Sequence, residues 1–186
     1  MLLACHDLRT PLATAHGFAR TLSRTGSLGE AETRYVEMIE QASAEIGELV
    51  DALGLVAQIE SGRYQPALRP TDPLAIARRA RELAGTEGIE VAGESGAPVT
   101  VDAPAAERAI AALAVCMQRY GAVDRVHVGV ADTRITLEPV KPEAAPVVLA
   151  DDLRDLGAAT ARAVLEAFGG SFELAGEKLT VRLPAA

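Results

Sequence analysis

Apolar residues recur at alternating steps of three and four along the first 62 residues. This spacing is typical of amphipathic helices that pack along a seam. Glycines at 26 and 29 interrupt the pattern, and Gly62 follows its end. The pattern predicts a helical hairpin, with helices near residues 1–24 and 30–61 and a glycine-terminated second helix. On the first predicted helix the apolar row consists of Cys5, Leu8, Leu12, Ala15, Ala19 and Leu22. On the second predicted helix the apolar row consists of Val36, Ile39, Ser43, Ile46, Val50, Leu53 and Ala57, and Tyr35, Ala42, Leu49 and Val56 widen this apolar face.

An isolated two-helix hairpin leaves much of its apolar surface in contact with water. Two copies that pack together as a four-helix bundle remove this exposure. We therefore expect the chain to form a homodimer through residues 1–62. The alternative is that the hairpin packs on the remainder of its own chain.

The remaining residues have a mixed pattern that predicts an α+β sandwich. A proline-containing linker over 63–72 separates two predicted domains, residues 1–63 and 64–186. Because helices and short strands alternate along the second domain, we expect helices on one face of a mixed sheet. Helices are predicted over 72–84, 102–120 and 152–168, and strands over 89–92, 99–101, 126–130, 135–137, 171–174 and 179–183. The predicted helical core positions are Ile110, Leu113, Met117, Val164, Leu165 and Phe168.

Composition excludes several classes of protein. The net charge of −8 argues against a nucleic-acid-binding protein, which needs clustered Lys and Arg to neutralise phosphates. Neither Cys5 nor Cys116 has the spacing of a metal-ligand motif, so no metal site is predicted. The longest apolar run, residues 109–117, is too short to cross a bilayer. We expect a cytoplasmic protein that does not bind membranes.

The predicted first helix carries a group of reactive side chains away from its apolar seam. Helical geometry places His6, Asp7 and Thr10 on this outer side, with Ala13 and Gly17 on the turns below them. A neutral imidazole is a competent nucleophile, a neighbouring carboxylate can hold its tautomer or accept its proton, and a hydroxyl can orient a water or a phosphoryl oxygen. The small residues leave a smooth surface that another protein can approach. Taken alone, an exposed histidine beside an aspartate is more often an ordinary polar surface, and His16 and His127 are expected to be ordinary histidines.

Residues 6–13, with the sequence HDLRTPLA, resemble the phosphoacceptor box of sensor histidine kinases. The end of the second predicted helix, residues 58–63, is also similar to the corresponding helix exit in that family. The resemblance implies that His6 accepts a phosphoryl group and that Asp7 is the base for its transfer. It also implies that Thr10 assists hydrolysis of a partner's phosphoaspartate.

Residues 64–186 resemble the ATP-binding domain of the same kinases, but with its ligands replaced. The resemblance places Cys116 at the position of the magnesium-binding Asn, and Asp155 at the first glycine of the phosphate-binding turn. The sequence Glu138 to Pro142 stands in place of the glycine-containing adenine motif, and residues 139–150 are short for an ATP lid. A thiol is a poor ligand for a hard cation, and a carboxylate at a helix start repels phosphates. We therefore expect a degenerate domain without a cofactor.

These features favour a histidine phosphotransferase of a two-component phosphorelay. In this hypothesis His6 passes a phosphoryl group between the aspartates of response-regulator receiver domains, which dock over Ala13 and Gly17 and supply Mg²⁺. ATP-dependent autophosphorylation is not expected. Three alternatives remain open: a divergent but active sensor histidine kinase core, a non-catalytic dimeric pseudokinase that binds a response regulator, and a phosphatase that depends on Asp7 and Thr10.

Overall fold

The computed structural model describes the backbone of residues 2–25 and 28–186, and the side chains of residues 8, 11–24 and 28–186. The chain divides into two compact units, Met1–Gly62 and Arg63–Ala186. The sequence predicts this boundary one residue later, after residue 63. Each unit is described separately below.

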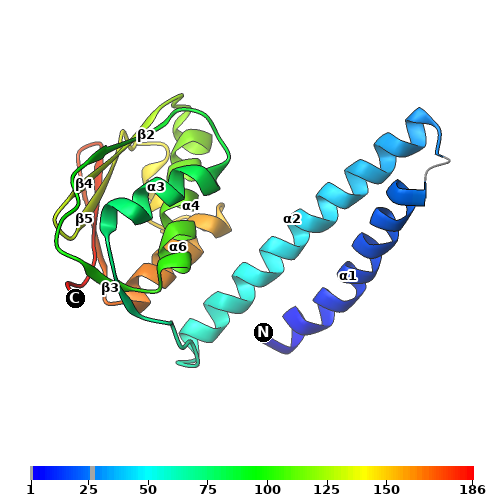
Figure 1. The fold of residues 1–186 in the computed structure, drawn as a ribbon, viewed down its shortest axis with the longest axis horizontal. Helices are drawn as coiled ribbons and strands as arrows, with labels where there is room; N and C mark the ends of the chain where they lie inside the picture. The colour runs from blue at the N-terminus through cyan, green and yellow to red at the C-terminus, as the bar shows by residue number, and fades with distance from the viewer. Residues whose placement is uncertain (1, 26–27) are drawn as a thin grey trace. The chain divides into compact units, whose positions relative to one another are not determined.

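Unit 1 is a hairpin of two long helices, α1 (Leu2–Thr25) and α2 (Glu30–Glu60) (Figure 1). Ala19 of α1 is buried in the hairpin, and Leu12 lies beside Gly47 of α2, where an added Cβ would be 3.6 Å from the leucine Cδ2. Ser23 Oγ donates a hydrogen bond of 3.0 Å to Glu40 Oε1. The predicted helical hairpin is confirmed, with helix ends within about one residue of the predicted ones.

The long helix α2 has two apolar faces, of which only one is covered. Five of its residues are buried, and all but Gly54 are spaced by seven: Val36, Ser43, Val50, Gly54 and Ala57. Ile39, Ile46 and Leu53 of the same predicted apolar row remain exposed, because a hairpin offers α2 only one partner helix. We call this uncovered row the exposed seam; it consists of Tyr35, Ile39, Ala42, Ile46, Leu49 and Leu53.

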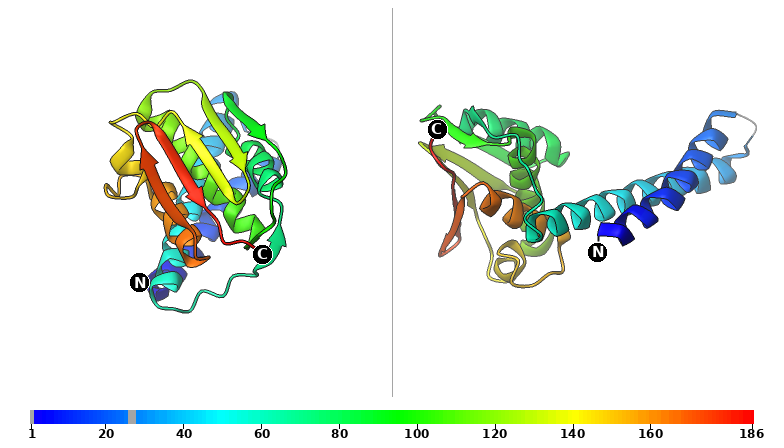
Figure 2. Two further views of the ribbon diagram at one scale, coloured as in Figure 1. Left: turned by 90° about the vertical axis from the view of Figure 1, so that its left-hand side faces the viewer. Right: turned by 90° about the horizontal axis from the view of Figure 1, so that it is seen from below.

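Unit 2 contains a five-stranded sheet with helices on one face (Figures 1 and 2). The strand order is β2-β4-β5-β7-β6; β2 is parallel to β4, and the other neighbours are antiparallel. The strands are β2 (Ile89–Gly93), β4 (Val126–Ala131), β5 (Arg134–Glu138), β6 (Ser171–Ala175) and β7 (Lys178–Arg182). The helices are α3 (Pro73–Ala84), α4 (Ala103–Gly121), the single turn α5 (Ala145–Val148) and α6 (Leu156–Ala167). A separate pair, β1 (Arg69–Thr71) and β3 (Val99–Val101), completes the unit.

The core of unit 2 lies between the sheet and its helices. Alternate residues of the central strands, such as Val128, Ile135 and Leu179, are buried, while His127 and Arg134 are exposed on the other face. Burial of one side chain in two is the pattern of a sheet covered on one face. All six predicted helical core positions are buried, and the predicted α+β architecture is confirmed.

Aspartates begin the three main helices of unit 2. Asp72 Oδ1 accepts a hydrogen bond from Leu74 N at 2.9 Å, and Asp102 and Asp155 cap α4 and α6 in the same manner. An aspartate at this position satisfies backbone N–H groups that have no partner within the helix.

Three expectations are corrected here: α6 begins at Leu156 and not near 152, the predicted linker contains β1, and the stretch 139–150 contains α5.

The linker that follows α2 is held by unit 2 from Tyr64 onwards. The Tyr64 ring stacks on Phe168, with ring centroids 6.4 Å apart. Ala67 N donates a hydrogen bond of 3.0 Å to Asp102 Oδ2. Asp102 therefore anchors both the start of α4 and the linker.

Candidate functional site

The predicted phosphoacceptor residues lie on the first three turns of α1. The helix is continuous from Leu2 to Thr25, and Pro11 lies within it. His6 and Thr10 are four residues apart, which places them on the same face of a helix. The side chains of His6, Asp7 and Thr10 lie outside the described residues, so their proposed roles stay predictions.

The surface below the phosphoacceptor residues is smooth. Ala13 and Gly17 are both exposed, and an added Cβ at Gly17 would have no neighbour within 4 Å. A narrow stretch of α1 is thus free, within the described part of unit 1, for close approach by another protein.

His16 lies in a different environment from that expected for a reactive histidine. Its side chain is half-buried, and within the described part of the chain its Nδ1 is buried without a hydrogen-bond partner. His127 is exposed on β4, where its Nδ1 is 3.2 Å from Glu90 Oε2. His127 thus has a carboxylate partner, but it lies on strand β4 of unit 2 and not on the helix that carries the HDLRTPLA box.

At the position where the resemblance places a magnesium ligand, Cys116 is completely buried in α4. The pKa of its thiol is raised from 9.0 to about 12, mainly by burial and in addition by the Asp155 carboxylate, while Arg119 partly opposes both effects. The thiol is therefore neutral at physiological pH and offers a hard cation no ligand.

Cys116 should react very slowly with thiol reagents in the folded protein. Alkylation requires the thiolate, and a pKa near 12 in place of 9.0 lowers the thiolate fraction at pH 8 by about 1000-fold. In a Cys5→Ser variant, we expect iodoacetamide to modify Cys116 rapidly in urea and hardly at all without it, as measured by mass spectrometry. Equal rates in the two conditions would contradict the buried position of this thiol.

The start of α6 is occupied by the chain's own carboxylate. Asp155 is 9% exposed; its Oδ1 accepts a hydrogen bond of 2.9 Å from Ala158 N, and its Oδ2 is 3.5 Å from Arg119 Nη1. At Gly157, an added Cβ would be 3.6 Å from Ala112 Cβ of α4. An N–H group that would otherwise be available to a phosphate is already satisfied, and the negative charge repels another anion.

The segment between β5 and α6 packs inward. Four of its apolar side chains are almost fully buried: Val140, Ala144, Val147 and Val148. Gly121 at the end of α4 lies against this segment, since an added Cβ there would be 3.5 Å from Ala144 Cβ. A neutral thiol, a capping carboxylate and a packed connection together do not fit a bound magnesium nucleotide.

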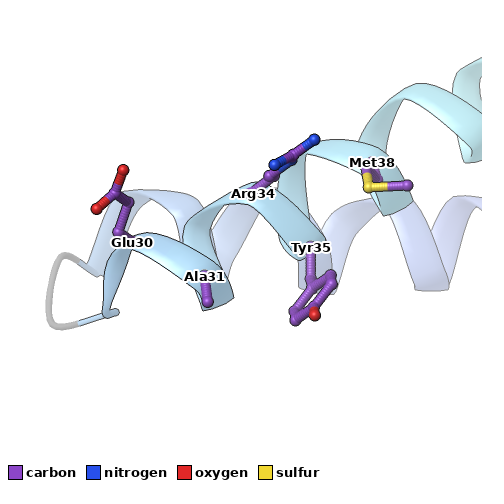
Figure 3. Close-up of a pocket in the computed structure, with 5 residues that line it drawn as sticks. All are labelled: Glu30, Ala31, Arg34, Tyr35 and Met38. Carbon is purple, nitrogen blue, oxygen red and sulfur yellow. The ribbon is translucent and has the colours of Figure 1, made fainter.

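A shallow depression of about 570 Å³ lies on unit 1, at the beginning of α2 (Figure 3). It is lined by Glu30, Ala31, Arg34, Tyr35 and Met38, all on α2. Tyr35 and Met38 are both more than half exposed, and Tyr35 belongs to the exposed seam. This depression extends an uncovered apolar surface, and its lining shows no arrangement of reactive groups.

Comparisons with known proteins found one family model that matches the first unit. Residues 4–62 match the family model of the His Kinase A (phospho-acceptor) domain. No curated protein sequence matches the chain significantly.

Solved structures share the fold of both units. Full-length ShkA, determined in complex with AMPPNP, has a TM-score of 0.75 and 21% identity over 99% of this chain, which spans only 45% of ShkA. The histidine kinase AdeS of Acinetobacter baumannii has a TM-score of 0.60 and 18% identity, covering 97% of this chain and 98% of AdeS. The cytoplasmic segment of the histidine kinase QseC has a TM-score of 0.50 and 13% identity over 74% of this chain and 95% of its own. At these identities the likeness is one of fold.

In the described part of the chain, no helix has the length and apolar character needed to cross a bilayer.

Proposed function

We propose that the chain is a histidine phosphotransferase that does not use ATP, because residues 4–62 match the family model of the His Kinase A phospho-acceptor domain and the chain shares its fold with histidine kinases. Its substrates are phosphorylated receiver domains of response regulators. His6 receives the phosphoryl group from the aspartate of one receiver and passes it to the aspartate of another.

The proposed transfer is a reversible exchange of one bond to phosphorus for another. The lone pair of the neutral His6 imidazole attacks the phosphorus of the receiver's phosphoaspartate. A P–N bond forms, the P–O bond breaks, and the aspartate leaves as a carboxylate. Asp7 holds the proton on the other imidazole nitrogen or accepts it as positive charge develops on the ring. The receiver supplies Mg²⁺ and docks over Ala13 and Gly17.

One observation supports this proposal above the others: the phosphoacceptor box accompanies a kinase-like fold in which the residues at the expected nucleotide ligand positions are buried or paired within the chain. Asp155 caps α6, Cys116 is neutral and buried, and Val147 and Val148 are buried in the segment that precedes α6. In this proposal ATP is not the phosphoryl donor of the chain, so the phosphoryl group on His6 comes from another phosphoprotein.

A homodimer is part of the same proposal. The exposed seam repeats at steps of four and three along α2, as expected for a helix that packs against another helix. Leu8 and Phe18 of α1 are also more than half exposed. A second copy of unit 1 would cover these side chains in a four-helix bundle, and the partner hairpin would be matched in length and pattern.

The proposal is tested by comparing two phosphate donors. A receiver domain charged with radiolabelled acetyl phosphate should label the chain within minutes, whereas radiolabelled ATP with Mg²⁺ should not label it. Label should then pass to a second, uncharged receiver. Labelling by ATP alone would instead identify an active kinase core.

The same assay separates the remaining alternatives. A pseudokinase would bind the receiver without taking label. A phosphatase would release inorganic phosphate from the receiver with no phosphohistidine intermediate, and Thr10→Ala would slow that release. Either result would reject the relay.

A further inference from the structure

The connection from the end of α5 to the start of α6, residues 149–155, is folded tightly on itself. Ala150 N donates a hydrogen bond to Val147 O at 3.0 Å. Asp151 N and Asp152 N both donate to Pro146 O, at 2.8 and 2.9 Å. Ala150 adopts a positive φ of 55°, which turns the chain sharply after α5. We call residues 149–155 the strap.

Arg162 of α6 holds the first half of the strap. Its guanidinium donates to the carbonyl oxygen of Leu149, and Nη1 lies 3.5 Å from Asp151 Oδ1. Its Nε donates to Glu166 Oε1 at 2.9 Å, which fixes the direction of the side chain. One cation therefore joins α6 to both the backbone and a carboxylate of the strap, and hydrogen bonds to a charged donor are among the stronger ones.

The last residues of α4 hold the second half. Tyr120 Oη donates a hydrogen bond of 3.0 Å to Arg154 O, and the Arg154 guanidinium lies 5.6 Å from the centre of the Tyr120 ring. Arg154 also pairs with Asp152 at 2.7 Å, within the strap itself. Arg119 reaches Asp155 at the end of the strap. Arg119, Arg154 and Arg162 are each paired with a carboxylate of the strap, which opposes their use by an anionic ligand.

From these contacts we infer that the strap is a built-in cover, closed without any ligand, which joins the end of α4 to α6 where the resemblance to histidine kinases implies a nucleotide. Arg162 is the residue that anchors it. This inference deepens the proposed function, since a strap closed by the chain's own groups would explain why His6 depends on another phosphoprotein. Unit 2 would then reach its full stability with neither ATP nor Mg²⁺.

Hydrogen exchange followed by mass spectrometry on the full chain tests the inference. Arg162→Gln removes the charge while keeping a side chain of similar reach. We expect amide exchange across residues 150–154 to become at least tenfold faster, with no change in peptides from β5 and β7. Arg134→Gln, which alters an exposed arginine on the open face of the sheet, should leave strap exchange unchanged. In the wild-type chain, adding Mg²⁺ with AMPPNP should not slow strap exchange.

Two outcomes would overturn the inference. One is unchanged exchange in the strap of Arg162→Gln, and the other is protection of the wild-type strap by the nucleotide. If Arg162→Gln fails to fold, Tyr120→Phe replaces it: this variant removes only the hydroxyl that reaches Arg154 O, and faster exchange limited to residues 153–155 is expected. Phosphotransfer to His6 is measured on the same samples. If exchange in the strap behaves as expected but no phosphoryl group reaches His6, the relay is rejected and the inference about the strap stands. If transfer occurs but the nucleotide slows exchange in the wild-type strap, the inference about the strap is rejected and the relay stands.

Discussion

His6→Ala is expected to reduce phosphoryl transfer from a charged receiver to the background level. The substitution removes the only atom proposed to form a bond to phosphorus, so no slower version of the same reaction remains. Asp7→Asn keeps the nucleophile and alters only the neighbouring carboxylate, and a loss of about 10²- to 10⁴-fold is expected for it, as is usual for general acid–base groups. Rapid-quench measurement of label on the chain gives both rates.

His16→Ala is the matched control for this experiment. His16 lies on the same helix but is half-buried, and it is not part of the proposed docking surface. Transfer should persist in this variant, and the phosphorylated residue should have the acid lability and alkali stability of a phosphohistidine. Transfer that survives His6→Ala, or that disappears with His16→Ala in a folded dimer, would place the acceptor elsewhere.

Ile46→Asp is expected to convert the proposed dimer to a monomer. Ile46 is 50% exposed at the middle of the exposed seam, where two copies would bring the same residue into one apolar core. An unpaired carboxylate buried in such an interface costs several kcal/mol, and each 1.4 kcal/mol weakens binding tenfold. We expect the dissociation constant to rise by more than 100-fold, as measured by sedimentation at micromolar concentrations.

Ala44→Asp is a suitable comparison because it adds the same side chain two residues away. Two residues along a helix correspond to about 200°, so position 44 is exposed on the side of α2 away from the seam. This variant should stay dimeric. Circular dichroism is needed for both, since a loss of helix would explain monomers without any role for the seam. A wild-type chain that sediments as a monomer would favour packing of the seam on other parts of the same chain.

Sequence periodicity was sufficient to predict the hairpin and most of unit 2, because apolar spacing reports directly on the buried face of a long element. It did not show which apolar residues of α2 are buried in the hairpin and which remain exposed. Val36 and Ile39 both fit one helical seam, and only the position of α1 shows that the first is buried and the second exposed.

The misplaced elements are short or lie beside competing signals. β1 has three residues including Pro70, and α5 is a single turn, so neither contains enough positions to establish a period. The start of α6 is preceded by three aspartates, any of which is a good cap. Asp152 pairs with Arg154 in the structure, which leaves Asp155 to cap the helix.

The candidate site was likewise predictable where its evidence is local in the sequence, and not where it depends on contacts between distant residues. The phosphoacceptor box is a local motif, and the replacement of glycine by Asp155 is visible in the chain itself. The anchoring role of Arg162 could not be predicted, since its partner Leu149 is 13 residues away and offers only a backbone oxygen, which every residue has. Tyr120 is 34 residues from Arg154, and no repeating pattern relates the two positions.

The contacts of Tyr64 with Phe168 and of Ala67 with Asp102 make the first residues of unit 2 part of its folded body. Helix α2 ends at Glu60, so only Ser61, Gly62 and Arg63 separate its last turn from the anchored stretch. Gly62 has a φ of 67°, a torsion that most other residues adopt only at a cost. A residue with a Cβ at position 62 would therefore strain the backbone directly after α2, even though, in the described part of the chain, no atom beyond its immediate neighbours lies within 4 Å of the added group.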